Sequence, residues 1–142
     1  MAYKVVFYSR SGYSRKIAEQ LATGLGCECL EITDGRDWRG MVGLIRAGYY
    51  SSTGKDVTIT VHGSILPDDD VIAVSPVWAG KVMPAIRMFL KDHPRDKVRY
   101  VATSNGTGLR DRDGFKSVTD VIRSRKDAQE VVEIFLKDLS SV

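Results

Sequence analysis

Short apolar runs alternate along this chain with segments in which apolar residues recur every three or four positions. Runs at residues 3–8, 27–32, 71–75, 97–104 and 116–122 are rich in β-branched and aromatic side chains and predict buried strands, the third ending at Pro76. Helical periodicity marks residues 14–25, 83–93 and 124–139, and a glycine-interrupted segment predicts a further helix around 41–50. Strands that alternate with helices predict one α/β domain over residues 1–142.

Composition restricts the class of protein. With 43% hydrophobic and 27% charged residues, the chain has the profile of a globular domain with a real core. No apolar stretch approaches the roughly 20 residues that a membrane span needs, and Met1 runs into a strand without a signal segment, so we expect a cytoplasmic protein. The net charge is +3 without a lysine or arginine block, so we expect no nucleic-acid partner.

The residues that most often bind metals give no metal site. Cys27 and Cys29 stand two positions apart on a predicted strand, where they are expected to be packing residues. The aspartates at 68–70 lack spaced partners and indicate a solvated turn. His62 and His93 are isolated in sequence, so no catalytic dyad is expected.

A polar turn follows the first predicted strand. Ser9, Ser11 and Ser14 supply hydroxyl groups, Gly12 permits a sharp bend, and Arg10, Arg15 and Lys16 add positive charge. Because a helix N-terminus presents unpaired N–H groups, this turn suits an anion. A solvated turn in which a serine such as Ser14 merely caps the helix fits the same residues equally well.

Two further loops follow predicted strands and so belong at the same edge of a parallel sheet. In the loop at 75–84, Trp78 is expected to be exposed and to offer a flat face to a planar ligand, although burial in the core is the alternative. The loop at 103–114 is polar, glycine-rich and long, which is typical either of a ligand loop or of a plain surface loop.

Three stretches of this chain resemble the flavodoxin family: VVFYSRSGYSRKIAEQLA, VIAVSPVWAGKVMPAIRMFL and YVATSNGTG. The resemblance implies a doubly wound sheet of five parallel strands in the order 2-1-3-4-5, with FMN at the switch point between the first and third strands. It assigns the FMN phosphate to Ser9, Arg10, Ser11, Gly12, Tyr13 and Ser14. It assigns the ring system to Pro76, Val77, Trp78, Ala79 and Gly80 on one side and to Ser104, Asn105, Gly106, Thr107 and Gly108 on the other.

The chain departs from the family in three ways. The third loop has no tyrosine to flank the flavin. The chain is basic, with Lys81 beside the second loop, which predicts a higher reduction potential than in acidic members. Only about a dozen residues connect the fourth and fifth strands, barely enough for a crossover, so the helix there is expected to be shortened or absent. The exposed sheet would then need the terminal helix or a second copy to cover it, which predicts a homodimer.

The resemblance implies an FMN-binding electron carrier that exchanges electrons with a redox partner protein or a small quinone-like acceptor. A small FMN-dependent NAD(P)H:quinone-type reductase, which would make the protein an oxidoreductase enzyme, stays open; the absence of a GxGxxG fingerprint favours the carrier. A non-redox binding module also stays open, with Trp38, Tyr49 and Tyr50 as partner-facing anchors or as part of a helix that covers the sheet.

Overall fold

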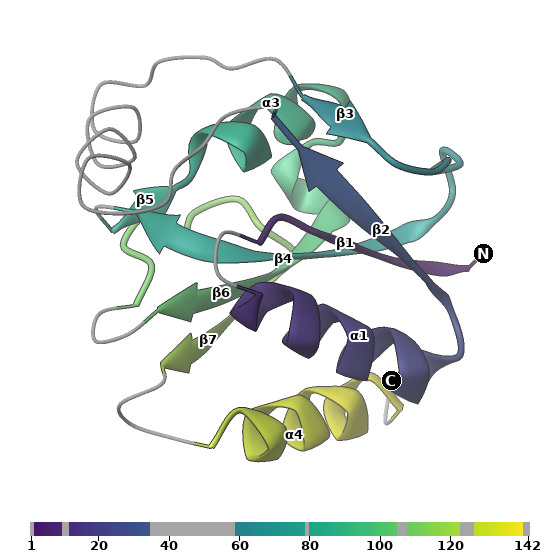
Figure 1. Ribbon diagram of the computed structural model, residues 1–142, viewed down its shortest axis with the longest axis vertical. Coiled ribbons are helices and arrows are strands. Elements are labelled where there is room, and N and C mark those ends of the chain that lie inside the picture. Colours follow the sequence, from purple (N-terminus) through teal and green to yellow (C-terminus); the bar gives the residue numbers. More distant parts are fainter. Residues whose placement is uncertain are drawn as a thin grey trace.

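A mostly parallel β-sheet forms the centre of the molecule, with helices on both faces (Figure 1). The structure is a computed structural model that describes residues 2–9, 12–34, 59–78, 80–104, 108–122 and 127–140. The helix predicted around residues 41–50, with its neighbours Trp38, Tyr49 and Tyr50, lies outside the described residues. The predicted class, α/β with a central parallel sheet, is confirmed.

Hydrogen bonding orders the sheet as β3-β2-β1-β4-β6-β7, and β5 pairs with β4 off this path. The parallel strands are β1 (Tyr3–Phe7), β2 (Glu28–Thr33), β4 (Asp70–Trp78), β6 (Val98–Ser104) and β7 (Ser117–Ile122). Two short strands pair antiparallel, β3 (Thr60–Val61) with β2 and β5 (Lys81–Val82) with β4. The helices of the described residues are α1 (Tyr13–Leu25), α3 (Pro84–Asp92) and α4 (Ala128–Ser140), and a 3-10 turn, η1 (Arg95–Lys97), precedes β6.

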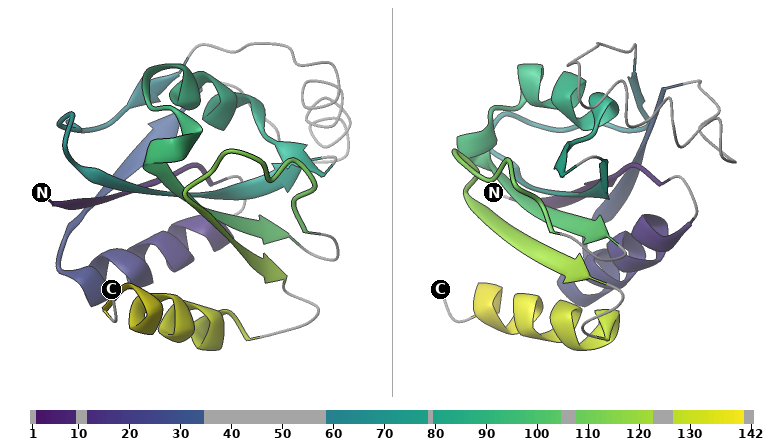
Figure 2. Two further views of the ribbon diagram at one scale, coloured as in Figure 1. Left: turned by 180° about the vertical axis from the view of Figure 1, so that it is seen from behind. Right: turned by 90° about the vertical axis from the view of Figure 1, so that its left-hand side faces the viewer.

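Each face of the sheet has its own apolar core. On one face, α1 and α4 lie side by side and bury Ile17, Leu21 and Phe135 against β1, β4 and β6 (Figures 1 and 2). On the other face, α3 buries Ile86 and Phe89 in the second cluster. Strands that are covered on both faces must be apolar on both, which is why they read as unbroken hydrophobic runs.

β4 is longer than the sequence predicts, because it continues through Pro76 to Trp78. The Tyr8 amide donates to Val74 O at 3.0 Å, so the backbone groups of Val74, and again those of Pro76, point toward the β1 side. The β1 ladder has already ended at the pair Phe7–Val74. The missing N–H of proline therefore costs no ladder bond, and β4 stays paired with β6 at Pro76.

Helix α1 has a glycine cap at each end. Gly12 is the N-cap with φ of 93°, and Gly26 is the C-cap with φ of 64°. The prediction that Ser14 caps the helix is wrong, because Ser14 lies inside the first turn and is buried. The helix runs to Leu25, close to the predicted end, and Gly24 lies within its last turn.

The connection from β6 to β7 contains no helix within residues 108–116, which we call the crossover. Leu109 is buried in the α3-side core, and the Phe115 ring stacks on Tyr100 with 5.0 Å between centroids. The crossover thus covers the sheet surface that we expected the terminal helix or a second copy to cover, while α4 packs on the opposite face.

Cys27 and Cys29 pack against the core beneath α1 and α4, as the sequence predicts. Burial raises the pKa of both thiols, that of Cys29 to about 11, so they are protonated at neutral pH. Among the described residues, no three His, Cys, Asp or Glu side chains are grouped to hold a metal ion. No described helix is long and apolar enough to cross a membrane.

Candidate functional site

The carboxyl ends of β1, β4 and β6 meet at one edge of the sheet, and the loops that follow them define the candidate site. The first of these loops joins β1 to α1. Its bend is made by Gly12, whose φ of 93° disfavours any other residue although nothing would crowd a Cβ there. The Gly12 amide donates to Ser9 Oγ at 2.8 Å, which leaves the hydroxyl proton of Ser9 able to donate.

The N-terminus of α1 has the charge distribution of an anion site. Its N-cap, Gly12, has no side chain to cap it, and its first turn contains no acidic residue. An α-helix leaves the N–H groups of its first turn without partners inside the helix, where the dipole is positive. Arg15 and Lys16 add positive side chains in the same turn, although Arg15 also pairs with Glu31 at 2.7 Å. An anion at this end of the helix would be stabilised by all of these groups.

A buried pair of hydroxyl groups joins the first turn of α1 to β6. Ser14 Oγ lies 2.8 Å from Thr103 Oγ1, and each residue is 3% exposed. Because a hydroxyl group can accept while it donates, a bond donated by Thr103 leaves Ser14 a proton for a further acceptor. The sequence placed Thr103 both in the predicted strand 97–104 and at the start of the loop 103–114, but it gave no signal for the contact with Ser14, 89 positions away.

The second loop differs from the prediction, because Trp78 is only 6% exposed. Its ring meets that of Tyr8 edge-on, with centroids 6.0 Å apart and planes at 88°. Trp78 belongs to the α3-side core together with Val82, since β4 continues past Pro76 and turns into the short hairpin with β5. The expected exposed aromatic face is therefore wrong, and the alternative of a core tryptophan is confirmed.

Gly80 connects the second loop to the crossover. The Arg110 amide donates to Gly80 O at 2.8 Å, and Gly80 has φ of 73°. A Cβ on Gly80 would stand 2.8 Å from Arg110 Nε, so only glycine lets this side chain lie where it does. The sequence identified Gly80 but gave no signal for its neighbour Arg110, which is 30 positions away.

The remaining predicted residues follow these two strands. Pro76 and Val77 are half-buried at the end of β4. Ser104 ends β6, and its Oγ is buried without a hydrogen-bond partner, while a Cβ on Gly108 would stand 2.9 Å from Asp120 Oδ1. Tyr13 begins α1 beside Gly12 and is half-buried. The predicted site residues outside the described part of the chain are Arg10, Ser11, Ala79, Asn105, Gly106 and Thr107.

The fold and the position of the site together define an α/β protein of flavodoxin-like architecture, with its candidate site at the carboxyl edge of the sheet. Comparison with solved structures gives the same class. A flavoprotein of Lactobacillus acidophilus NCFM, in complex with FMN, superposes with a TM-score of 0.68 at 20% identity, over 84% of this chain and 92% of that chain.

Two Bacteroides proteins to which a flavoprotein function is attributed are also similar to this chain. That of Bacteroides uniformis ATCC 8492 has a TM-score of 0.72 at 14% identity, over 94% of this chain and 97% of that chain. That of Bacteroides eggerthii DSM 20697 has a TM-score of 0.66 at 17% identity, over 98% of each chain. At these identities the likeness is one of fold. Comparisons with protein families and with curated proteins give no match.

Proposed function

We propose that this chain binds FMN and acts as a small electron carrier. The observation that carries the proposal is the N-terminus of α1, which begins at a glycine N-cap, has no acidic residue in its first turn and follows β1. β1 lies between β2 and β4, where the order of a doubly wound sheet reverses and ligands bind. The similarity in fold to a flavoprotein in complex with FMN supports the proposal.

The residues proposed to hold the phosphate fit that group. Ser9 has a hydroxyl proton to donate, and Gly12 bends the backbone around the helix N-terminus. Ser14 lies in the same turn, fixed by Thr103. Arg10, Ser11 and Tyr13 complete the proposed set.

The proposed ring site must be revised from the sequence prediction. Trp78 has no open face for a planar ring, because only 6% of the residue is exposed. We therefore assign the ring contacts to the half-buried Pro76 and Val77 and to the backbone around Ala79 and Gly80, with Trp78 packed behind them. Ser104 has a buried hydroxyl without a partner, which suits a polar contact with the ring edge, and residues 105–108 are proposed to lie beside it.

FMN supplies one- and two-electron chemistry, and the chain supplies binding, orientation and electrostatics. Lys81 is exposed beside Gly80, so positive charge near the ring is proposed to favour the reduced, anionic cofactor and to raise its potential. As a carrier, the protein would exchange electrons with a redox partner protein or a quinone-like acceptor in the cytoplasm. The homodimer stays a proposal although the crossover covers the sheet surface that suggested it, and the molar mass in light scattering tests it.

The decisive measurement is the visible absorbance spectrum after FMN is added and the excess is removed by desalting. We expect a retained two-banded flavin spectrum. Gly12→Ala should abolish retention, and Gly26→Ala is the matched control, because both glycines have positive φ and neither Cβ would meet an atom within 4 Å. Each substitution should cost about 1–2 kcal/mol of unfolding free energy, so only binding separates them. Flavin retained equally by both variants would contradict the proposed phosphate site.

A second candidate function is a non-redox module that binds a phosphorylated ligand. The burial of Trp78 favours it, because a ligand without a planar ring needs only the N-terminus of α1. Wild-type protein that retains no flavin at micromolar FMN, yet binds inorganic phosphate through Gly12, would select this function. Oxidation of NAD(P)H by a quinone, faster than with free FMN, would instead select the reductase.

A further inference from the structure

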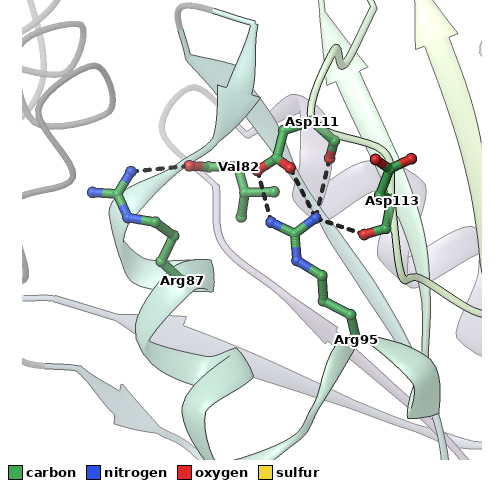
Figure 3. Close-up of polar contacts among 5 residues, drawn as sticks. All are labelled: Val82, Arg87, Arg95, Asp111 and Asp113. Carbon is green, nitrogen blue, oxygen red and sulfur yellow. Dashed lines mark hydrogen bonds and ion pairs between the residues drawn. The ribbon is translucent and has the colours of Figure 1, made fainter.

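Arg95 and Arg112 bind the crossover through hydrogen bonds and ion pairs, whereas the side chain of Arg110 does not. Arg95 donates to both carboxylate oxygens of Asp111, at 3.0 and 2.6 Å, and to Asp113 O at 3.0 Å (Figure 3). Arg112 donates to Asp120 Oδ2 at 2.6 Å. Within the described part of the chain, the side chain of Arg110 has neither an ion pair nor a hydrogen bond. Its charge therefore does not serve the loop.

The backbone nevertheless fixes Arg110 closely. Its amide donates to Gly80 O at 2.8 Å, and its carbonyl accepts from the Arg112 amide at 3.0 Å. Its side chain lies across Gly80, where a Cβ would stand 3.3 Å from Arg110 Cγ and 2.8 Å from Nε. The side chain of Arg110 has therefore lost conformational freedom, although its guanidinium has gained no partner among the described residues.

Among the described residues, Arg110 lines a pocket of about 430 Å³ together with Gly80, Lys81 and Asp111. Lys81 also has no ion-pair partner among the described residues. Asp111 does not neutralise these two cations, because both of its oxygens bond to Arg95 (Figure 3). Two exposed cations without described ion-pair partners therefore line one pocket, which gives it a positive potential that attracts an anion.

We propose that this pocket binds a small organic dianion, either a dicarboxylate or a phosphate monoester. Its volume suits a small metabolite. The planar guanidinium of Arg110 matches carboxylate and phosphate oxygens in two parallel bonds, and Lys81 supplies a second charge. The pocket shares Gly80 and Lys81 with the proposed ring site. It is distinct from the proposed phosphate site, because α1 packs on one face of the sheet and the crossover packs on the other, and the titration uses flavin-free protein. The proposal does not depend on FMN.

The test is calorimetric titration at low salt with two probes, succinate and glycerol 3-phosphate, and with acetate as the single-charge comparison. Arg110→Gln and Lys81→Gln remove one pocket charge each. Lys137→Gln is the control, since it removes the same charge from α4 on the opposite face. We expect a probe dianion to bind more tightly than acetate. Each pocket variant should weaken that binding at least about tenfold, or about 1.4 kcal/mol, and the control should leave it unchanged.

Amide chemical shifts locate the bound probe. A dianion in the pocket should shift the amide signals of Gly80 and Arg110, and tighter binding of one probe would identify its class as dicarboxylate or phosphate monoester. Unchanged affinity in both pocket variants would overturn the proposal, as would shifts confined to residues 12–16 or no binding at millimolar probe. Failure of the protein to retain FMN would leave these results unaffected, so the two proposals fail separately.

Discussion

The hydroxyl groups of Ser75 and Tyr100 form a buried pair whose two members should not cost the same to remove. Both residues are 0% exposed, and the oxygens lie 2.5 Å apart between the neighbouring strands β4 and β6. Ser75 Oγ also donates to Pro76 O at 3.2 Å, so it keeps a partner without the tyrosine hydroxyl. Tyr100 has no second partner among the described residues.

We therefore expect Tyr100→Phe to cost about 0.5–1.5 kcal/mol of unfolding free energy, the net value of one hydrogen bond. Ser75→Ala should cost about 1–3 kcal/mol, because it leaves the Tyr100 hydroxyl buried and unsatisfied. The double variant removes the unsatisfied group as well, so its cost should be smaller than the sum. Urea unfolding of the four proteins measures the cycle. Costs that add within about 0.5 kcal/mol, or a larger cost for Tyr100→Phe, would refute this account of the pair.

Burial also makes the pair sensitive to alkaline pH. It raises the pKa of Tyr100 well above the ordinary value, against the smaller opposing effect of the bond with Ser75. The unfolded chain ionises this tyrosine near pH 10 while the folded chain does not. The contribution of the protonated Tyr100 to the free energy of unfolding is therefore complete below about pH 10. Above that pH it falls by at most about 1.4 kcal/mol per pH unit. The stability difference between wild type and Tyr100→Phe should follow this course, and a difference constant up to about pH 11 would contradict it.

Two further predictions concern the crossover and the buried thiol. Arg95→Gln should cost about 1–2 kcal/mol, because Arg95 is partly exposed yet bonds to Asp111 and Asp113 and lies 4.6 Å from the Phe115 ring centroid. Hydrogen exchange should quicken in residues 108–116 and not in β1, and a uniform change would contradict the loop-specific role. The thiol of Cys29 has a pKa of about 11 against a reference of 9.0, so at pH 8 it should react with a disulfide reagent about a hundredfold more slowly than in urea. Equal native and denatured rates would show that burial does not protect it.

The sequence predicts the strands well because the signal for them is local. A strand covered on both faces needs an unbroken apolar run, and residues 3–8 and 97–104 supply one each. Pro76 misled the prediction of β4, since whether a missing N–H matters depends on where the neighbouring strand β1 ends. That information lies some 70 residues away in the chain and is not visible from the proline itself.

The candidate site was predicted in outline and missed in its contacts. Gly12 was identified because a glycine between a strand and a helix has a local meaning. The burial of Trp78 was not predicted, because it depends on the two-residue strand β5 and on the edge contact with Tyr8. Arg110 was missed for the same reason, since only the folded chain brings it against Gly80.

Gly24 makes the same point and can be tested directly. It lies in the last turn of α1, and its missing Cβ leaves room for Leu136 of α4, whose Cδ1 would stand 2.5 Å from a Cβ. Gly24→Ala should gain up to about 1 kcal/mol in helix propensity but lose some or all of it by displacing Leu136. In a Leu136→Ala background the displacement disappears, so the same substitution should stabilise the protein by the full amount. Urea unfolding of the four proteins separates the two terms. If Gly24→Ala had the same effect in both backgrounds, the contact with Leu136 would not explain why a glycine stands at this position.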